Sequence, residues 1–221
     1  MITYLLQFIA PDDCIQCGSE GLLLCEWCRL SLETVPSRCF YCQKVTNDYD
    51  ICDKCKNKSS IRKLYVANEY KNEPKELVAA LKFKSKRQAS IPISRIMAEQ
   101  LPYLDKETVL VNLPTAPKRV RQRGFDHTKL IAKAIAKQKG VKYINALSKT
   151  DNKRQVGATR KQRLNQAINS YRVTVPRKVA GKNVIIIDDV VTTGASIDSA
   201  VKILKKAGVK QVQAAVFAYT K

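Results

Sequence analysis

After residue 60, continuous apolar runs alternate along the chain with segments in which apolar residues recur every three or four positions. Runs rich in β-branched and aliphatic residues predict strands at 61–70, 108–113, 184–187 and 210–219. Apolar residues at helical spacing predict helices at about 74–84, 90–101, 125–139 and 197–207. Strands that alternate with helices are typical of an α/β fold, in which a mostly parallel sheet is covered on both faces.

The first 60 residues lack this alternation and hold all eight cysteines of the chain. We therefore expect two domains, a small cysteine-rich domain at 1–60 and an α/β domain at 61–221. The stretch 149–167 is polar, basic and only weakly periodic, so we expect a mobile loop there.

The eight cysteines form four pairs with the same Cys-x-x-Cys spacing. The pairs are Cys14/Cys17, Cys25/Cys28, Cys39/Cys42 and Cys52/Cys55. This spacing lets two thiolates of one tight turn face a single ion, and two such turns complete a tetrahedral Zn²⁺ site that is closed and therefore structural. We expect two Zn²⁺ ions in a double zinc ribbon. Pairing of neighbouring turns and interleaved pairing both fit the sequence.

Other uses of the cysteines are less well supported. Disulfides are disfavoured because the sequence shows no signal peptide, and redox Cys-x-x-Cys motifs do not usually occur in fours. An iron–sulfur cluster has no supporting spacing. Because residues 1–60 carry a formal charge of −2, we interpret this domain as a scaffold or a protein-docking element.

Positive charge is concentrated in the second domain. The chain has 40 basic and 19 acidic side chains, and residues 61–221 carry a formal charge of +23. Such a field favours polyphosphates, nucleic acid or an anionic lipid surface. No run of residues approaches the ~20 apolar residues that span a bilayer. We therefore expect a cytoplasmic protein, with peripheral contact to the inner face of the membrane through its partners.

A motif suited to a sugar phosphate follows the apolar run at 184–187. Asp188 and Asp189 could accept hydrogen bonds from two ribose hydroxyls, or help to hold Mg²⁺, at the carboxyl end of a buried strand. The next turn offers backbone N–H groups, hydroxyls and a helix N-terminus, which together can cradle a phosphate. The phosphate-binding residues predicted there are Thr192, Thr193, Gly194, Ala195 and Ser196.

The stretch 184–196 resembles the signature of type I phosphoribosyltransferases, which bind 5-phosphoribosyl 1-diphosphate with Mg²⁺. Three further segments resemble the ComF family of competence proteins, whose amino terminus also has paired Cys-x-x-Cys motifs. They are 81–84 (Leu-Lys-Phe-Lys), the Pro-rich and basic 113–125 with its Arg-Gly-Phe, and Gln155 followed by Arg163. The resemblance implies a type I phosphoribosyltransferase fold behind a zinc-ribbon domain.

The resemblance also implies a set of contacts to diphosphate, other anions or DNA, namely Lys82, Lys118, Arg119, Arg123 and Arg163. The middle three follow the strand 108–113, where cations can neutralise a diphosphate. The basic loop 149–163 would close over the site. The family commonly has Asn-Gln where Asp126 and His127 stand here, so neither is assigned a role, and His127 is expected on a helix surface.

The resemblance to the ComF family implies that the chain assists the handling and uptake of single-stranded DNA in natural transformation, beside a helicase-like ATPase. An active phosphoribosyltransferase is an alternative, although the sequence identifies neither a catalytic residue nor a nucleobase pocket. A third hypothesis is a sensor, in which 5-phosphoribosyl 1-diphosphate or a nucleotide shifts the affinity for DNA.

Overall fold

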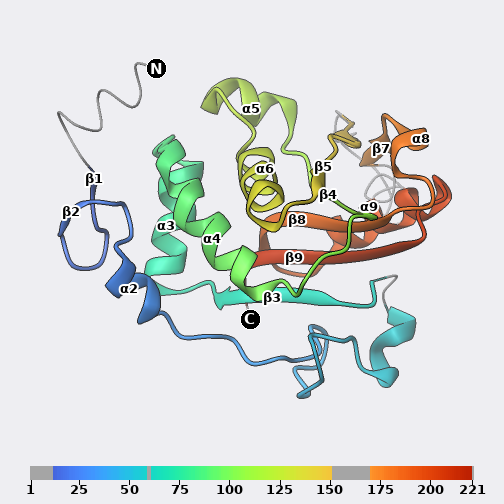
Figure 1. The fold of residues 1–221 in the computed structure, drawn as a ribbon, viewed down its shortest axis with the longest axis horizontal. Coiled ribbons are helices and arrows are strands. Elements are labelled where there is room, and N and C mark those ends of the chain that lie inside the picture. The colour runs from blue at the N-terminus through green and yellow to red at the C-terminus, as the bar shows by residue number, and fades with distance from the viewer. Residues whose placement is uncertain (1–11, 59–60, 151–169, 221) are drawn as a thin grey trace, which may run out of the picture.

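A five-stranded sheet forms the centre of the protein, for which a computed structural model describes residues 12–58, 61–150 and 170–220 (Figure 1). The strand order is β3-β9-β8-β4-β5, and each neighbouring pair is parallel. The strands are β3 (Leu64–Glu69), β4 (Thr108–Asn112), β5 (Lys142–Tyr143), β8 (Asn183–Val191) and β9 (Gln211–Tyr219). The predicted α/β class with a mostly parallel sheet is confirmed.

Helices cover both faces of this sheet (Figure 1). One face carries α3 (Asn72–Lys82), α4 (Ser90–Gln100) and α6 (His127–Lys139). The other carries α8 (Pro176–Val179) and α9 (Ala195–Lys206), with the antiparallel pair β6 (Leu147–Lys149) and β7 (Tyr171–Val173). In β8, Ile185 and Ile187 pack on the first face, whereas Val184 and Ile186 pack on the second. Each fully buried aliphatic side chain of this kind contributes about 1.5–3 kcal/mol.

The short elements β5, β6, β7 and α8 were not predicted from the sequence, and two further differences lie beside the cleft edge of the sheet. The strand expected at 184–187 continues to Val191, because its hydrogen-bonded register with β9 persists beyond the apolar run. A short helix, α5 (Pro117–Arg123), occupies a segment for which no element was predicted. It begins at a proline and ends at Gly124, whose φ of +81° suits glycine.

The cysteine-rich segment runs along one side of the sheet (Figure 1). It contains β1 (Asp12–Asp13), β2 (Glu20–Gly21), α2 (Glu26–Leu30) and a 3-10 helix at Asp53–Lys58. Ion pairs attach its first part to the layer of α3 and α4: Arg29 lies 2.6 Å from Glu99 of α4, and Lys86, in the connection between α3 and α4, lies 2.8 Å from Asp12. Among the described residues, no helix has the length and apolar character needed to cross a membrane.

Candidate functional site

A cleft of about 290 Å³ opens at the carboxyl ends of β4 and β8. Parallel sheets commonly bind ligands at this edge, and the volume is close to that of small-molecule pockets. Charged side chains of both signs line it, including Lys82, Arg119, Arg123, Lys149, Asp188 and Asp189. Five of these residues had been predicted for the site, and Lys149 begins the basic stretch predicted to close over it. The cleft therefore combines residues from five separate segments of the chain.

The two neighbouring acids of the motif point to opposite faces of the sheet. Both lie within β8, where successive side chains alternate between faces. Asp189 is 3% exposed and faces α3 and α6, whereas Asp188 is only partly buried and faces the β7 and α9 side. The two carboxylates therefore have different surroundings, although they are adjacent in the sequence.

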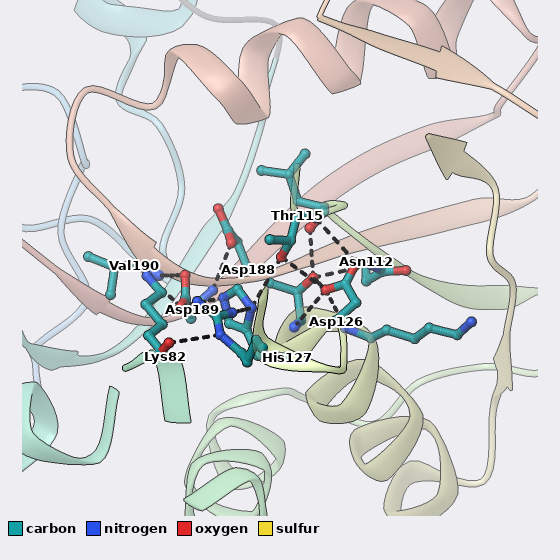
Figure 2. Close-up of polar contacts among 12 residues, drawn as sticks. Lys82, Asn112, Thr115, Asp126, His127, Asp188, Asp189 and Val190 are labelled. Atoms are coloured by element: carbon teal, nitrogen blue, oxygen red, sulfur yellow. Dashed lines mark hydrogen bonds and ion pairs between the residues drawn. The ribbon is translucent and has the colours of Figure 1, made fainter. Parts of the chain in front are cut away.

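Asp189 is held by two basic side chains (Figure 2). Its Oδ2 lies 2.6 Å from Nζ of Lys82 and 2.8 Å from Nε2 of His127, while the backbone N–H of Val190 donates to Oδ1 at 2.8 Å. Burial by itself would raise the pKa of Asp189. The hydrogen bond from His127 and the positive charge of Lys82 outweigh burial and hold the pKa well below its ordinary value. Asp189 is therefore a carboxylate at neutral pH.

His127 does not lie on the surface, and the expectation of a surface position is wrong. It is 5% exposed at the start of α6, where Asp189 accepts a hydrogen bond from Nε2. The Arg123 guanidinium contacts Nδ1 on the other side of the ring. Because a guanidinium can only donate, Nδ1 faces a donor on one side of the ring, while Nε2 faces the Asp189 carboxylate on the other.

Asp126 connects α6 to the turn that follows β4. Its carboxylate caps α6 by accepting from the backbone N–H groups of Thr128 at 3.1 Å and Lys129 at 3.4 Å. It also accepts from the backbone N–H of Thr115 at 3.2 Å and from the Thr115 hydroxyl at 3.1 Å (Figure 2). Asp126 thus fixes one wall of the cleft. An acid directly before a helical pattern is a sequence signal that could have identified this role.

Asp188 faces the cleft, and its negative charge is less favourable in the folded protein than that of Asp189. One carboxylate oxygen accepts the backbone N–H of Asp189 at 2.9 Å. Burial, together with the negative charge of Asp189, raises the pKa of Asp188 well above its ordinary value. A cation, or a pair of hydroxyl donors, placed beside Asp188 would relieve both effects.

The raised pKa of Asp188 predicts a pH dependence of ligand binding. Mg²⁺ or ribose hydroxyls require the carboxylate, so binding below the raised pKa should release a proton, and affinity should increase as the pH rises through that value. Calorimetry with 5-phosphoribosyl 1-diphosphate and Mg²⁺, in two buffers of different ionisation enthalpy, measures the released proton. Asp188→Asn should abolish the buffer dependence, and an unchanged dependence in this variant would contradict the prediction.

The predicted phosphate-binding turn connects β8 to α9. Gly194 caps α9 with φ of +76°, a left-handed conformation that other residues adopt at a cost. The Thr193 hydroxyl accepts the backbone N–H of Ala195 at 3.4 Å. Thr192, Thr193, Ala195 and Ser196 are exposed, and Gly194 is buried. The turn therefore presents its polar groups to solvent, and phosphate binding there stays a prediction.

Two of the residues predicted to contact anions, Lys118 and Arg163, are not among the described residues that line the cleft. Lys118 is exposed on α5 and does not line the cleft, whereas its neighbour Arg119 does. Arg163 lies outside the described residues, together with most of the loop expected at 149–167. Arg123 reaches inward, where Nε donates to the carbonyl oxygen of Lys82 at 2.8 Å.

The cysteines form two groups of four that could each hold a metal ion. The first is Cys14, Cys17, Cys25 and Cys28, and the second is Cys39, Cys42, Cys52 and Cys55. Within each group all sulfur atoms lie within 4.8 Å of one another, and all eight thiols are free. Hydrogen bonding with Ser19 lowers the pKa of Cys17 to about 6, which favours the thiolate that a metal requires. Because each group joins two Cys-x-x-Cys turns that are consecutive in the sequence, neighbouring turns pair rather than interleave. Four cysteine sulfurs are a donor set that fits structural zinc.

Comparisons with known proteins agree with these features. The phosphoribosyl transferase domain family matches residues 125–221. Competence protein F of Haemophilus influenzae is 22% identical over 215 residues, which are 90% of this chain and 93% of that protein. DNA utilization protein YhgH of Escherichia coli is 24% identical over 202 residues, 86% and 87% of the two chains. Competence protein ComFC of Streptococcus pneumoniae is 32% identical over 111 residues, 49% of this chain but only 46% of that protein.

Proposed function

We propose that this protein, a homologue of the ComF competence proteins with a phosphoribosyltransferase domain, assists the handling of single-stranded DNA during natural transformation. The observation that carries the proposal is that relatives named for competence and for DNA utilization align with nearly the whole chain. The formal charge of +23 on residues 61–221 supports binding to a nucleic-acid backbone.

The cleft is proposed to bind 5-phosphoribosyl 1-diphosphate or a nucleotide. In this arrangement the 5-phosphate lies at the turn 192–196, and the ribose hydroxyls and Mg²⁺ lie at Asp188. The diphosphate extends toward α5, where Arg119 and Lys118 neutralise it. Support comes from the shared cleft, in which Arg119, Asp188 and Ser196 all form the lining.

Asp189 is proposed to act mainly through Lys82. The ion pair of 2.6 Å keeps the ammonium group at the cleft, where it can also attract the ligand's phosphates. A direct contact between Asp189 and ribose or Mg²⁺ would require Lys82 to move or to share the carboxylate. Arg123 contacts the opposite side of His127 and is proposed to stabilise this network near the anion.

The cellular setting follows from the same proposal. Residues 1–60 would form a double zinc-ribbon domain with two structural Zn²⁺ ions, and 61–221 the phosphoribosyltransferase-like domain. The protein would work in the cytoplasm beside a helicase-like competence ATPase, and would reach the inner face of the membrane through such partners. Its basic surface suits the anionic headgroups found there.

The match of a phosphoribosyl transferase domain to residues 125–221 favours a second candidate, an active phosphoribosyltransferase or a sensor built on that fold. Diphosphate release from 5-phosphoribosyl 1-diphosphate with a panel of nucleobases tests the enzyme. Release with one base supports turnover. Ligand binding without release, coupled to a change in DNA affinity, supports the sensor.

Calorimetry with 5-phosphoribosyl 1-diphosphate and Mg²⁺ tests the proposed cleft, first alone and then with single-stranded DNA present. Binding to the wild type and a loss of about tenfold or more in Asp188→Asn are expected, because the variant loses a charged acceptor. Glu107→Gln is a matched control, since Glu107 is an exposed acid that precedes β4 at the opposite end of the sheet. The absence of binding to the wild type would contradict the proposed ligand.

Affinity for single-stranded DNA should fall steeply with salt. Each phosphate neutralised contributes a slope of about −0.7 in log affinity against log salt. Lys118→Ala should reduce the slope by about that amount, because Lys118 is exposed on the basic helix α5. Lys56→Ala, in the acidic cysteine-rich segment, should leave it unchanged. Affinity that is independent of salt in a filter-binding titration would overturn the DNA proposal.

A further inference from the structure

The second cysteine group lies directly against the predicted phosphate-binding turn. Phe40 and Tyr41 occupy the two positions between Cys39 and Cys42. A Cβ atom placed on Gly194 would lie 3.1 Å from Cε1 of Phe40 and 3.7 Å from the Tyr41 hydroxyl. The two rings pack edge to face with their centroids 5.2 Å apart. The aromatic pair therefore covers the backbone of the turn at its glycine.

Tyr41 also reaches the first turn of α9. Its hydroxyl donates to Oδ2 of Asp198 at 3.1 Å, and the backbone N–H of Asp198 donates to the carbonyl oxygen of Gly194 at 2.9 Å. A carboxylate so near a helix N-terminus competes with a bound phosphate for the same positive potential. The hydrogen bond from the Tyr41 hydroxyl partly neutralises the Asp198 carboxylate, and so weakens this competition.

The first cysteine group has different neighbours. Ile15, in the corresponding position of its Cys-x-x-Cys turn, packs with the core that α3 and α4 form on the other face of the sheet. The ion pairs of this group, Arg29 with Glu99 and Arg95 with Glu26, also lead to α4. The two groups are therefore alike in chemistry but different in position, and the nearest contacts of Gly194 among the described residues come from the second group.

A glycine-containing turn pays a conformational entropy cost when it is ordered by a ligand. A rigid aromatic surface on one side reduces that cost in advance, since it limits the conformations of the free turn. The exposed residues of the turn leave its other side open to the ligand. Phe40 thus supplies pre-organisation, and Tyr41 adjusts the local charge.

We propose that Phe40 and Tyr41 are positioning residues for the phosphate-binding turn, so that the cysteine group carrying them sets the affinity of the cleft. This inference rests on the proposed binding of a phosphoribosyl ligand. It assigns the second cysteine group a role in recognition that the first group does not share.

Calorimetry with 5-phosphoribosyl 1-diphosphate and Mg²⁺ on the full chain tests the inference. We expect affinity to fall about tenfold in Phe40→Ala and about fivefold in Tyr41→Phe, each with two metal ions per chain retained. Removing the competing charge with Asp198→Asn in the Tyr41→Phe background should restore most of the affinity, which a purely structural role of Tyr41 would not predict. Ile15→Ala is the matched control and should leave affinity unchanged.

Hydrogen exchange of the amides at 190–198, without ligand, provides a separate measurement. Faster exchange in Phe40→Ala and Tyr41→Phe than in Ile15→Ala supports the positioning role even if the wild type binds no phosphoribosyl ligand, in which case only the proposed function fails. Wild-type exchange in both variants would overturn the inference, as would unchanged affinity in a wild type that does bind. Tyr41→Phe alone decides the matter if Phe40→Ala does not fold.

Discussion

Replacing Asp189 with asparagine is expected to lower the free energy of unfolding by about 3 kcal/mol. The side chain is 5% exposed and faces Lys82 at 2.6 Å and His127 at 2.8 Å, and removing one partner of a buried ion pair leaves an uncompensated charge. Lys82 retains 23% side-chain exposure, which places the effect at the lower end of the range for such pairs, about 3–5 kcal/mol.

Urea unfolding of the wild type and the variant, followed by circular dichroism, measures this difference. Asp188→Asn is the matched control, because it removes the adjacent carboxylate, whose raised pKa means that its charge is unfavourable in the folded state. The control should keep or increase stability at neutral pH. Equal destabilisation by the two substitutions would contradict the distinct roles assigned to the two acids.

The same pair should respond to pH with opposite signs. Asp189 has a lowered pKa, so its stabilisation is present above the ordinary value of about 3.9 and is lost as the pH falls from there toward its folded-state pKa. Asp188 has a raised pKa, so its contribution is fully present below the ordinary value and is lost as the pH rises through the raised one. The effect of Asp189→Asn should therefore shrink in acid.

Features that depend on the spacing of nearby residues, such as the cysteine pairs and the helices, could be predicted from the sequence. The four Cys-x-x-Cys motifs predicted two groups of four metal-ligating cysteines, and the structure shows that neighbouring motifs pair to form each group. The resemblance to the ComF family is supported by relatives that cover most of the chain. The helices appeared where apolar residues recur at helical spacing, because that spacing determines which side chains reach the core.

Features that depend on distant segments could not be predicted. His127 is buried because α3 and β8 bring Lys82 and Asp189 to it, and no local pattern contains that information. The length of β8 was underestimated because two acids usually end an apolar strand. Here Asp189 is paired with Lys82 and His127 of the helices on one face, and Asp188 borders the cleft. The hydrogen-bonded ladder can therefore continue to Val191.

Other differences came from signals that are present in the sequence. Pro117 and Gly124 bound α5 in the way that proline and glycine commonly bound short helices. Asp126 precedes the apolar pattern of α6 at the capping position. By resemblance alone, 113–125 is only a Pro-rich, basic segment and Asp126 only a departure from the family pattern.

Removal of metal is expected to have the largest effect of all, and to act mainly on the cysteine-rich segment. Structural Zn²⁺ contributes about 10–16 kcal/mol of apparent binding free energy in zinc-finger peptides, which fold only with the metal bound. Residues 12–56 should therefore unfold on chelation, whereas the sheet, whose two faces are buried by separate helical layers, should remain folded. Metal analysis should give about two zinc ions per chain, one for each group of four cysteines.

Hydrogen exchange with mass spectrometry separates the two regions in one experiment. After chelation, the amides between Cys14 and Cys55 should exchange rapidly, while those of β4 and β8 keep their protection. Cys17→Ser and Cys42→Ser, both at exposed ligand positions, should each lose one metal ion, and added zinc but not magnesium should refold the chelated wild type. An iron chromophore, or full protection in a metal-free chain, would contradict the assignment. Because Phe40 and Tyr41 belong to this segment, chelation should also loosen the turn at Gly194.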